Sequence, residues 1–281
     1  MRVLERPLQE AALVFRLCSE AITNPELRAR LEDIAPYVRD AEGVYDAAAR
    51  AAQLYTVPRT NPVGAVTAEE MSTLYERQMS AASGPARPIY DAIRAAPLYG
   101  ICPLCGHRVV TTLDHHLPKS RYPALAVCPL NLIPSCTDCN QAKGIRFPTL
   151  PQEQTLHPYF DNFESTRWLH AYVLEQTPPS VRFHTLVPPG VVPEIGDRLQ
   201  RHFVIFKLGP LYSANASQEL VNISGTLKNL YVSGGAEEVQ NHLREQERSR
   251  RAAHLNSWQT AMYGALLANH WFCQGGLLEI G

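Results

Sequence analysis

The sequence predicts an α+β protein that is mainly helical and has a small cysteine-rich module at its centre. Apolar residues recur at helical spacing before residue 98, and two C-x-x-C pairs with short apolar runs fill residues 99–150. From 151 to 281 the patterns are partly strand-like and partly helical. We therefore expect a helical N-terminal domain over 1–98, a central domain over 99–150, and a mixed C-terminal domain over 151–281 that ends in long helices.

The composition is that of an ordinary globular protein. Its 281 residues are 45% hydrophobic and 19% charged, with 26 Lys and Arg against 27 Asp and Glu. This balance excludes collagen-like and disordered chains, and no apolar run approaches the ~18 residues of a membrane helix. The charged start, Met1-Arg-Val-Leu-Glu-Arg6, is unlike a signal peptide. We therefore expect a cytoplasmic protein with no membrane partner.

Helical periodicity dominates the first domain. Apolar residues from Leu27 to Tyr55 follow one another at steps of three and four, which places them on one face of a helix, or of two helices broken near Pro36. Thr67 and Glu70 form a capping-box sequence that marks the start of another helix. We interpret these stripes as the core of a helix bundle, without a role in chemistry.

Strands and helices are both expected in the last domain. Residues 181–183 and 202–206 are rich in β-branched and aromatic side chains and predict two strands. Residues 216–232 and 236 to about 272 predict helices, with Gly234-Gly235 as the break between them.

Two C-x-x-C pairs are the strongest chemical signal. Cys102 and Cys105 form the first pair, and Cys136 and Cys139 form the second. Each pair lets two thiolates reach one ion from a tight turn, so the four together predict a tetrahedral structural zinc site in preference to core or redox cysteines. Residues 99–150 also carry five basic and two acidic side chains, the only basic excess in the chain, which suits a phosphate-binding centre.

The polar residues near these cysteines are typical of a catalytic site. Asp114 and His115 end a strand-like run before a proline-bounded loop, where they can place a metal ligand beside a proton acceptor. Asn140 follows the last cysteine, and Lys143 lies three positions further on, so both share one face of a helix. Asp114 and His115 alone would fit a buried structural pair. The whole ordered set favours catalysis.

This set resembles the HNH endonucleases, whose zinc-stapled catalytic module is of the ββα-metal type. The resemblance covers about 45 of the 281 residues. Its matching positions, in order, are Asp114, His115, Pro118, Asn131, Cys136, Cys139, Asn140 and Lys143. The family's base lies three residues before the proline, which selects His115 and not His116. Asn140 departs from the strict pattern, which has a histidine at that position and a correspondingly different metal preference.

The resemblance implies one-metal hydrolysis of a phosphodiester bond. Asp114 and Asn140 would hold Mg²⁺ or Mn²⁺ through oxygen atoms, and His115 would take a proton from the attacking water. Asn131 would tie the loop to the strand and orient His115.

The substrate and partners follow from the same resemblance. Lys119, Arg121 and Lys143 would contact substrate phosphates, and DNA is favoured over RNA because water-activated cleavage uses no 2′ hydroxyl. Residues 123–160 more loosely resemble HNH proteins encoded beside ATPases in bacterial anti-phage defence loci. This second resemblance implies an antiviral role with an ATPase subunit as partner. The acidic balance and the size of the flanking domains predict that they dock such a partner or a second copy of the chain.

Two other functions are compatible with the cysteines. One is a non-catalytic zinc-binding module that recognises nucleic acid or protein, and the other is a zinc redox switch. Asp114, His115 and Asn140 favour the enzyme, because a binding module needs no proton acceptor beside a hard-metal site.

Overall fold

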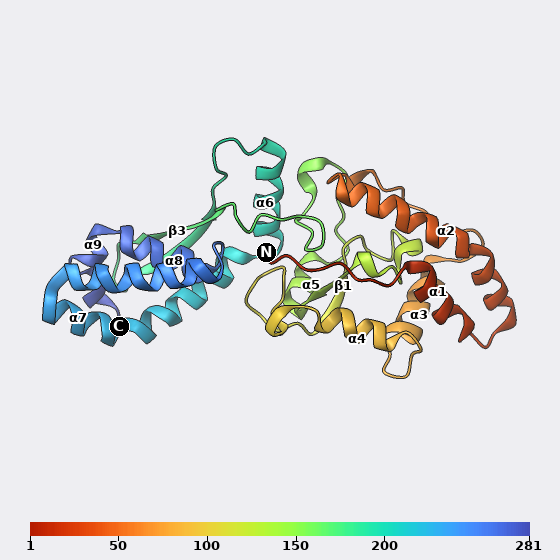
Figure 1. Cartoon of the computed structure of the whole chain (residues 1–281), viewed down its shortest axis with the longest axis horizontal. Helices are drawn as coiled ribbons and strands as arrows, with labels where there is room; N and C mark the ends of the chain where they lie inside the picture. Colours follow the sequence, from red (N-terminus) through yellow and green to blue (C-terminus); the bar gives the residue numbers. More distant parts are fainter. The chain divides into compact units, whose positions relative to one another are not determined.

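The computed structural model describes all 281 residues, in two compact units, Met1–Asp161 and Asn162–Gly281 (Figure 1). Helices dominate both units, and each contains one two-stranded antiparallel hairpin. This confirms the predicted α+β class. None of the helices combines the length and apolar character needed to cross a membrane.

The first unit begins with helices that surround a hairpin–helix module. Its helices before the hairpin are α1 (Ala11–Glu20), α2 (Pro25–Arg50), α3 (Ala68–Leu74) and α4 (Arg87–Ala95). Short helical turns are η1 (Leu54–Thr56), the π-helical η2 (Tyr75–Ser80), η3 (Leu98–Gly100), η4 (Pro123–Leu125), η5 (Pro129–Asn131) and η6 (Pro151–Glu153). The module consists of β1 (Thr112–His115), β2 (Leu132–Ser135) and α5 (Thr137–Lys143).

The long apolar stripe of the first unit forms one helix and not two. The Asn24 side chain caps α2 by accepting from the amides of Glu26 and Leu27, and the helix then continues through Pro36. Proline removes one backbone hydrogen bond there. The buried face on both sides of it keeps the helix continuous, since tertiary packing supplies most helix stability in proteins.

The predicted capping box at the start of α3 is present. Thr67 Oγ1 accepts from the Glu70 amide at 3.2 Å, and Glu70 Oε2 accepts from the Thr67 amide at 2.9 Å. Glu70 also receives two hydrogen bonds from the Arg30 guanidinium on α2, so the cap joins two helices.

The helices and the module share one hydrophobic core, so the predicted boundary near residue 98 does not divide the structure. This core runs from Ala11 in α1 to Leu132 in β2. The unit ends at Asp161 and not at 150, because the following segment returns to α2. There Gln154 bonds the Leu54 amide and the Ala52 carbonyl, and His157 bonds the Tyr45 hydroxyl.

The second unit packs helices on a hairpin. Its elements are β3 (Leu169–Leu174), β4 (Ser180–Thr185), α6 (Pro193–Ile205), α7 (Leu208–Ala253), α8 (Trp258–Ala268), α9 (His270–Cys273) and η7 (Gly276–Glu279). Both α7 and α8 contact the hairpin (Figure 1). The predicted strand at 181–183 lies in β4, and the predicted break appears inside α7, where Gly235 has φ 68°. A glycine tolerates this value at little cost.

The predicted strand at 202–206 is wrong, because these residues end α6. The helix buries Arg198, Leu199, His202 and Ile205, which recur at steps of one, three and three along one helical face. Pro193 supplies the helix start. The β-branched content of the segment was therefore outweighed by the burial of one helical face.

Candidate functional site

Four cysteines come together in the first unit as a site that can hold a metal ion. The sulfur atoms of Cys102, Cys105, Cys136 and Cys139 all lie within 4.8 Å of one another, and all four residues are buried. Four thiolates at this separation fit a tetrahedral zinc ion. The predicted grouping of the four cysteines is therefore confirmed.

Local backbone geometry brings these sulfurs together. The Cys105 sulfur accepts from the Arg108 amide at 3.4 Å, and Cys136 is the N-cap of α5, where its sulfur accepts from the Cys139 amide at 3.4 Å. Arg108 also forms an ion pair with Asp138 at 3.3 Å. The cysteine cluster thus fastens the segment before β1 to the start of α5.

The module next to this cluster has the order strand, strand, helix. In its antiparallel hairpin Asp114 pairs with Ile133 and His115 with Leu132. The connection between the two strands is tied by Asn131, which is fully buried. Its side chain accepts from the Leu117 amide at 2.8 Å and donates to the carbonyls of Leu117 and Leu125 at 2.9 and 3.2 Å. These bonds hold Leu117 and Leu125, both in the connection, close to Asn131.

Asp114, His115 and Asn140 line one cleft with a volume of about 480 Å³. Asp114 and His115 come from the end of β1, and Asn140 comes from α5, one residue after the cysteine cluster. Lys119 also lines this cleft. The structure therefore brings together four of the predicted site residues, from three segments of the chain.

His115 is held in a defined tautomer. Its Nε2 lies 2.7 Å from the Ala126 carbonyl oxygen, and because a carbonyl can only accept, Nε2 carries the proton. The ring packs edge-on against Tyr75 at 4.5 Å between ring centroids. Burial is the main cause that lowers the pKa of His115 to about 3, so the ring is neutral at pH 7 with Nδ1 as its proton-accepting nitrogen.

Asp114 is buried beside a buried cation. Lys143 Nζ lies 3.1 Å from Asp114 Oδ1, and both side chains are only about 5% exposed. Burial raises the pKa of Asp114 to about 6, although the charge and hydrogen bond of Lys143 act in the opposite direction. The position of Asp114 is thus set by Lys143.

Lys143 does not have the role predicted for it. Its ammonium donates to Asp114 and to the carbonyls of His115 and Gly144, at 2.7 and 3.3 Å for the carbonyls. These bonds occupy the three donors of an ammonium, and the side chain is buried, so it is not placed to contact a substrate phosphate. Asn140 and Lys143 lie on one face of α5, and at the end of the helix this face is buried, so the Lys143 side chain points into the interior of the unit.

The two other predicted phosphate contacts are placed differently. Lys119 lies at the cleft, where its ammonium pairs with Glu76 and sits 5.1 Å from the centre of the Tyr75 ring. Arg121 is exposed and does not line the cleft. Sequence reasoning missed Tyr75 and Glu76, which belong to the π-helical η2 and showed only as part of a bundle helix. Single π-helical turns occur often at functional sites, but they have no sequence signature.

His116 lies away from the cleft and packs against a second buried histidine. Its ring is 4.4 Å from that of His157 between centroids. His157 Nδ1 accepts from the Tyr159 amide, and its Nε2 contacts the Tyr45 hydroxyl at 2.9 Å. These contacts join the loop after α5 to α2, which gives His157 a structural role.

The fold and this site define a mainly helical α+β protein with a hairpin–helix module fastened by four cysteines. The chain is 30% identical over 243 residues to protein ea31 of Escherichia phage lambda, and the match covers 83% of this chain and 81% of ea31. It therefore belongs to the same family as ea31. No protein-family model matches the chain, and no solved structure matches it.

Proposed function

We propose that this protein is an HNH endonuclease that hydrolyses DNA phosphodiester bonds with one catalytic metal ion and a histidine base. The observation that supports this most is the convergence of Asp114, His115 and Asn140 on one cleft, in a strand–strand–helix module beside a four-cysteine site. A carboxylate, an amide oxygen and a neutral imidazole in one cleft are the groups that such hydrolysis requires.

His115 is the general base. Because Ala126 holds the proton on Nε2, Nδ1 is the nitrogen left to accept a proton from the attacking water. Packing against Tyr75 limits other orientations. Its lowered pKa keeps the imidazole neutral at pH 7.

Asp114 and Asn140 suit a hard divalent cation, since both supply oxygen ligands. Lys143 bonds Oδ1 of Asp114, which leaves the second carboxylate oxygen for the ion. Mg²⁺ or Mn²⁺ bound there would neutralise charge on the scissile phosphate and stabilise the departing oxygen. The four thiolates, by contrast, suit a structural zinc ion.

Lys119 is the substrate contact nearest the reacting groups. Its ammonium exchanges the Glu76 carboxylate for a phosphate when DNA enters the cleft. Arg121 contacts the DNA backbone further from the cleft. With Lys143 buried, few cations remain to bind phosphates, so the isolated chain binds DNA weakly, and its affinity falls with salt only in proportion to those few contacts.

The test is conversion of supercoiled plasmid by the purified protein with Mg²⁺, Mn²⁺ or EDTA. We expect metal-dependent nicking or linearisation that His115→Ala and Asn140→Ala both lose. Gln141→Ala is the matched control, because Gln141 is the exposed neighbour of Asn140 on α5. Zinc content and melting temperature, equal in all four proteins, would show that the fold is retained.

Two outcomes would contradict the proposal. If His116→Ala abolished cleavage while His115→Ala left it intact, the assignment of the base would be wrong. If no metal supported cleavage, either by the chain alone or with its copurified partner, but the protein still bound DNA, the non-catalytic zinc module would replace the enzyme.

The physiological setting that we propose is attack on foreign DNA, together with an ATPase subunit or a second copy of the chain. The relative ea31 is encoded by a phage, so the same chemistry would serve a phage as well as a host. Copurification of the tagged chain from its native cells, followed by plasmid cleavage with and without the partner, tests this. Full activity of a monomer alone would contradict the need for a partner.

A further inference from the structure

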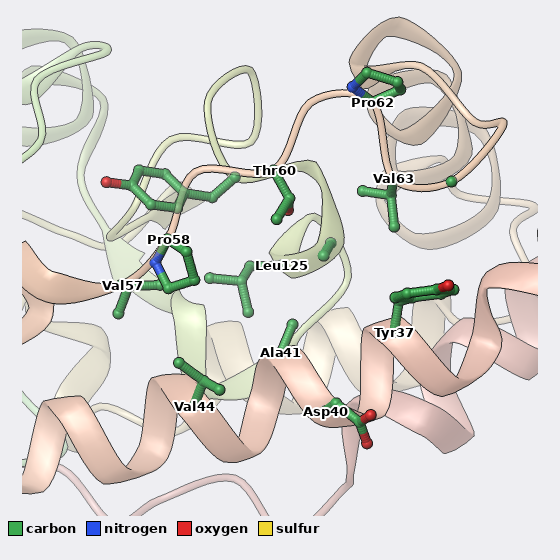
Figure 2. A pocket seen from close by; sticks show the side chains of 13 residues that line it. Tyr37, Asp40, Ala41, Val44, Val57, Pro58, Thr60, Pro62, Val63 and Leu125 are labelled. Atoms are coloured by element: carbon green, nitrogen blue, oxygen red, sulfur yellow. The ribbon is translucent and has the colours of Figure 1, made fainter.

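A second cavity lies in the first unit, apart from the cleft. It is formed by one face of α2, by residues 57–64 and by the segment around η4, and its volume is about 320 Å³. Figure 2 shows Leu125 between the helix that carries Ala41 and Val44 and the segment that carries Pro58 and Thr60. No residue of the cleft around His115 lines this cavity.

The walls of this cavity are almost entirely apolar. Its floor is built from buried side chains, among them Val57, Val63 and Leu125. The one charged residue in the lining, Asp40, is 69% exposed and bonds the neighbouring Arg39 at 3.2 Å. A charged ligand group would therefore find no buried partner, and its desolvation would oppose binding.

The size of the cavity favours a small molecule over a protein partner. Ligand sites in proteins begin at about 300 Å³ and are lined mostly by hydrophobic and aromatic side chains. Among the lining residues only Tyr37 and Val44 are large hydrophobics with substantial exposure, at 60% and 46%. A stable protein interface needs roughly 1,000 Å² of buried surface, far more than these two side chains present.

The backbone that forms one wall of the cavity continues directly into the residue that bonds His115. Ala124 and Leu125 line the cavity, and the next residue, Ala126, supplies the carbonyl that bonds His115 Nε2 at 2.7 Å. The Leu125 carbonyl also accepts from the Asn131 side chain at 3.2 Å. A ligand that packs against Leu125 thus acts on the backbone that orients His115.

We propose that this cavity binds a small uncharged apolar molecule, and that the bound molecule restrains η4 and so holds His115 in its working orientation. The second part rests on the proposed function, because it assigns His115 the role of base. The first part stands on the cavity alone.

The binding test uses N-phenyl-1-naphthylamine, a neutral probe whose fluorescence rises in apolar sites. We expect a saturable increase with one probe per chain. Ala41→Trp and Val44→Trp, which fill the cavity from α2, should lose this signal. Ala47→Trp is the matched control, because Ala47 is exposed on the same helix outside the lining, and it should bind as the unmodified protein does. A signal that does not saturate, or that both filling variants retain, overturns the site.

The coupling test compares the protein with and without saturating probe. We expect the ¹⁵N resonances of the His115 ring, assigned by their loss in His115→Gln, to shift, and plasmid cleavage to rise about 3-fold, the effect of one better-held hydrogen bond. Val44→Trp should cleave at the raised rate and ignore the probe. Saturable binding that leaves the His115 resonances unchanged overturns the coupling. A chain that never cleaves DNA but shows both the binding and the shift refutes only the endonuclease.

Discussion

Replacing Lys143 by methionine separates a positioning role from a phosphate-binding role. The change keeps most of the aliphatic side chain and removes the ammonium that bonds Asp114 and two backbone carbonyls. Because both side chains of the pair are about 5% exposed and burial already raises the pKa of Asp114 to about 6, Asp114 would lose its counter-charge and either stay an unpaired buried carboxylate or take up a proton. Breaking such a pair from one side costs about 3–5 kcal/mol. We expect a loss of about 3 kcal/mol in the free energy of unfolding of the first unit.

Urea unfolding of Lys143→Met, Asp114→Asn and the double variant measures this loss as a double-mutant cycle. The matched control is Lys119→Met, whose half-exposed pair with Glu76 should contribute at most about 1 kcal/mol. In DNA binding the order should be reversed, with the larger effect for Lys119→Met. Lys119→Met should lower the slope of log affinity against log salt by about 1, and Lys143→Met should leave it unchanged. A stability loss below about 1 kcal/mol for Lys143→Met, together with a lowered salt slope, would refute the positioning role.

Three further predictions concern the supports of the site. Cys139→Ser should abolish zinc binding, measured by mass spectrometry of the native protein, whereas Cys273→Ser in the second unit should retain it. Asn131→Ala removes three buried hydrogen bonds and should cost about 2–4 kcal/mol in urea unfolding, and a near-neutral result would contradict its role as a tie. The hydrogen bond from Arg30 lowers the pKa of Glu70 to about 2, so this carboxylate stabilises the fold above pH ~4.5 and loses that effect as the pH falls towards 2. Glu70→Gln should therefore cost about 1 kcal/mol at pH 7 and less at pH 3 in thermal melts, and an equal cost at both values would contradict this account.

Features set by nearby residues were predictable from the sequence, and features set by distant contacts were not. The C-x-x-C pairs, the capping box of Thr67 and the helix that begins at the second cysteine pair depend on spacings of a few residues, and the structure contains each of them. The burial of Lys143 depends on how α5 faces β1, which spacing along one helix cannot specify. The same holds for α6, whose β-branched residues indicated a strand until packing in the second unit was known.

The loop between β1 and β2 joins two parts of this site that are held differently. The two proposed metal ligands are held rigidly, whereas the orientation of His115 can be adjusted. Its end is held by Asn131, and Cys139 of the cysteine cluster lies in α5 one residue before Asn140, so the two proposed metal ligands have little freedom. His115 has a different kind of support, since its Nε2 bonds the carbonyl of Ala126, which follows a wall of the apolar cavity and lies outside the cysteine cluster. Catalysis by positioned groups is sensitive to shifts of about 1 Å. Loss of zinc should therefore act first on metal binding at Asp114 and Asn140, whereas a change in the cavity should act first on the base.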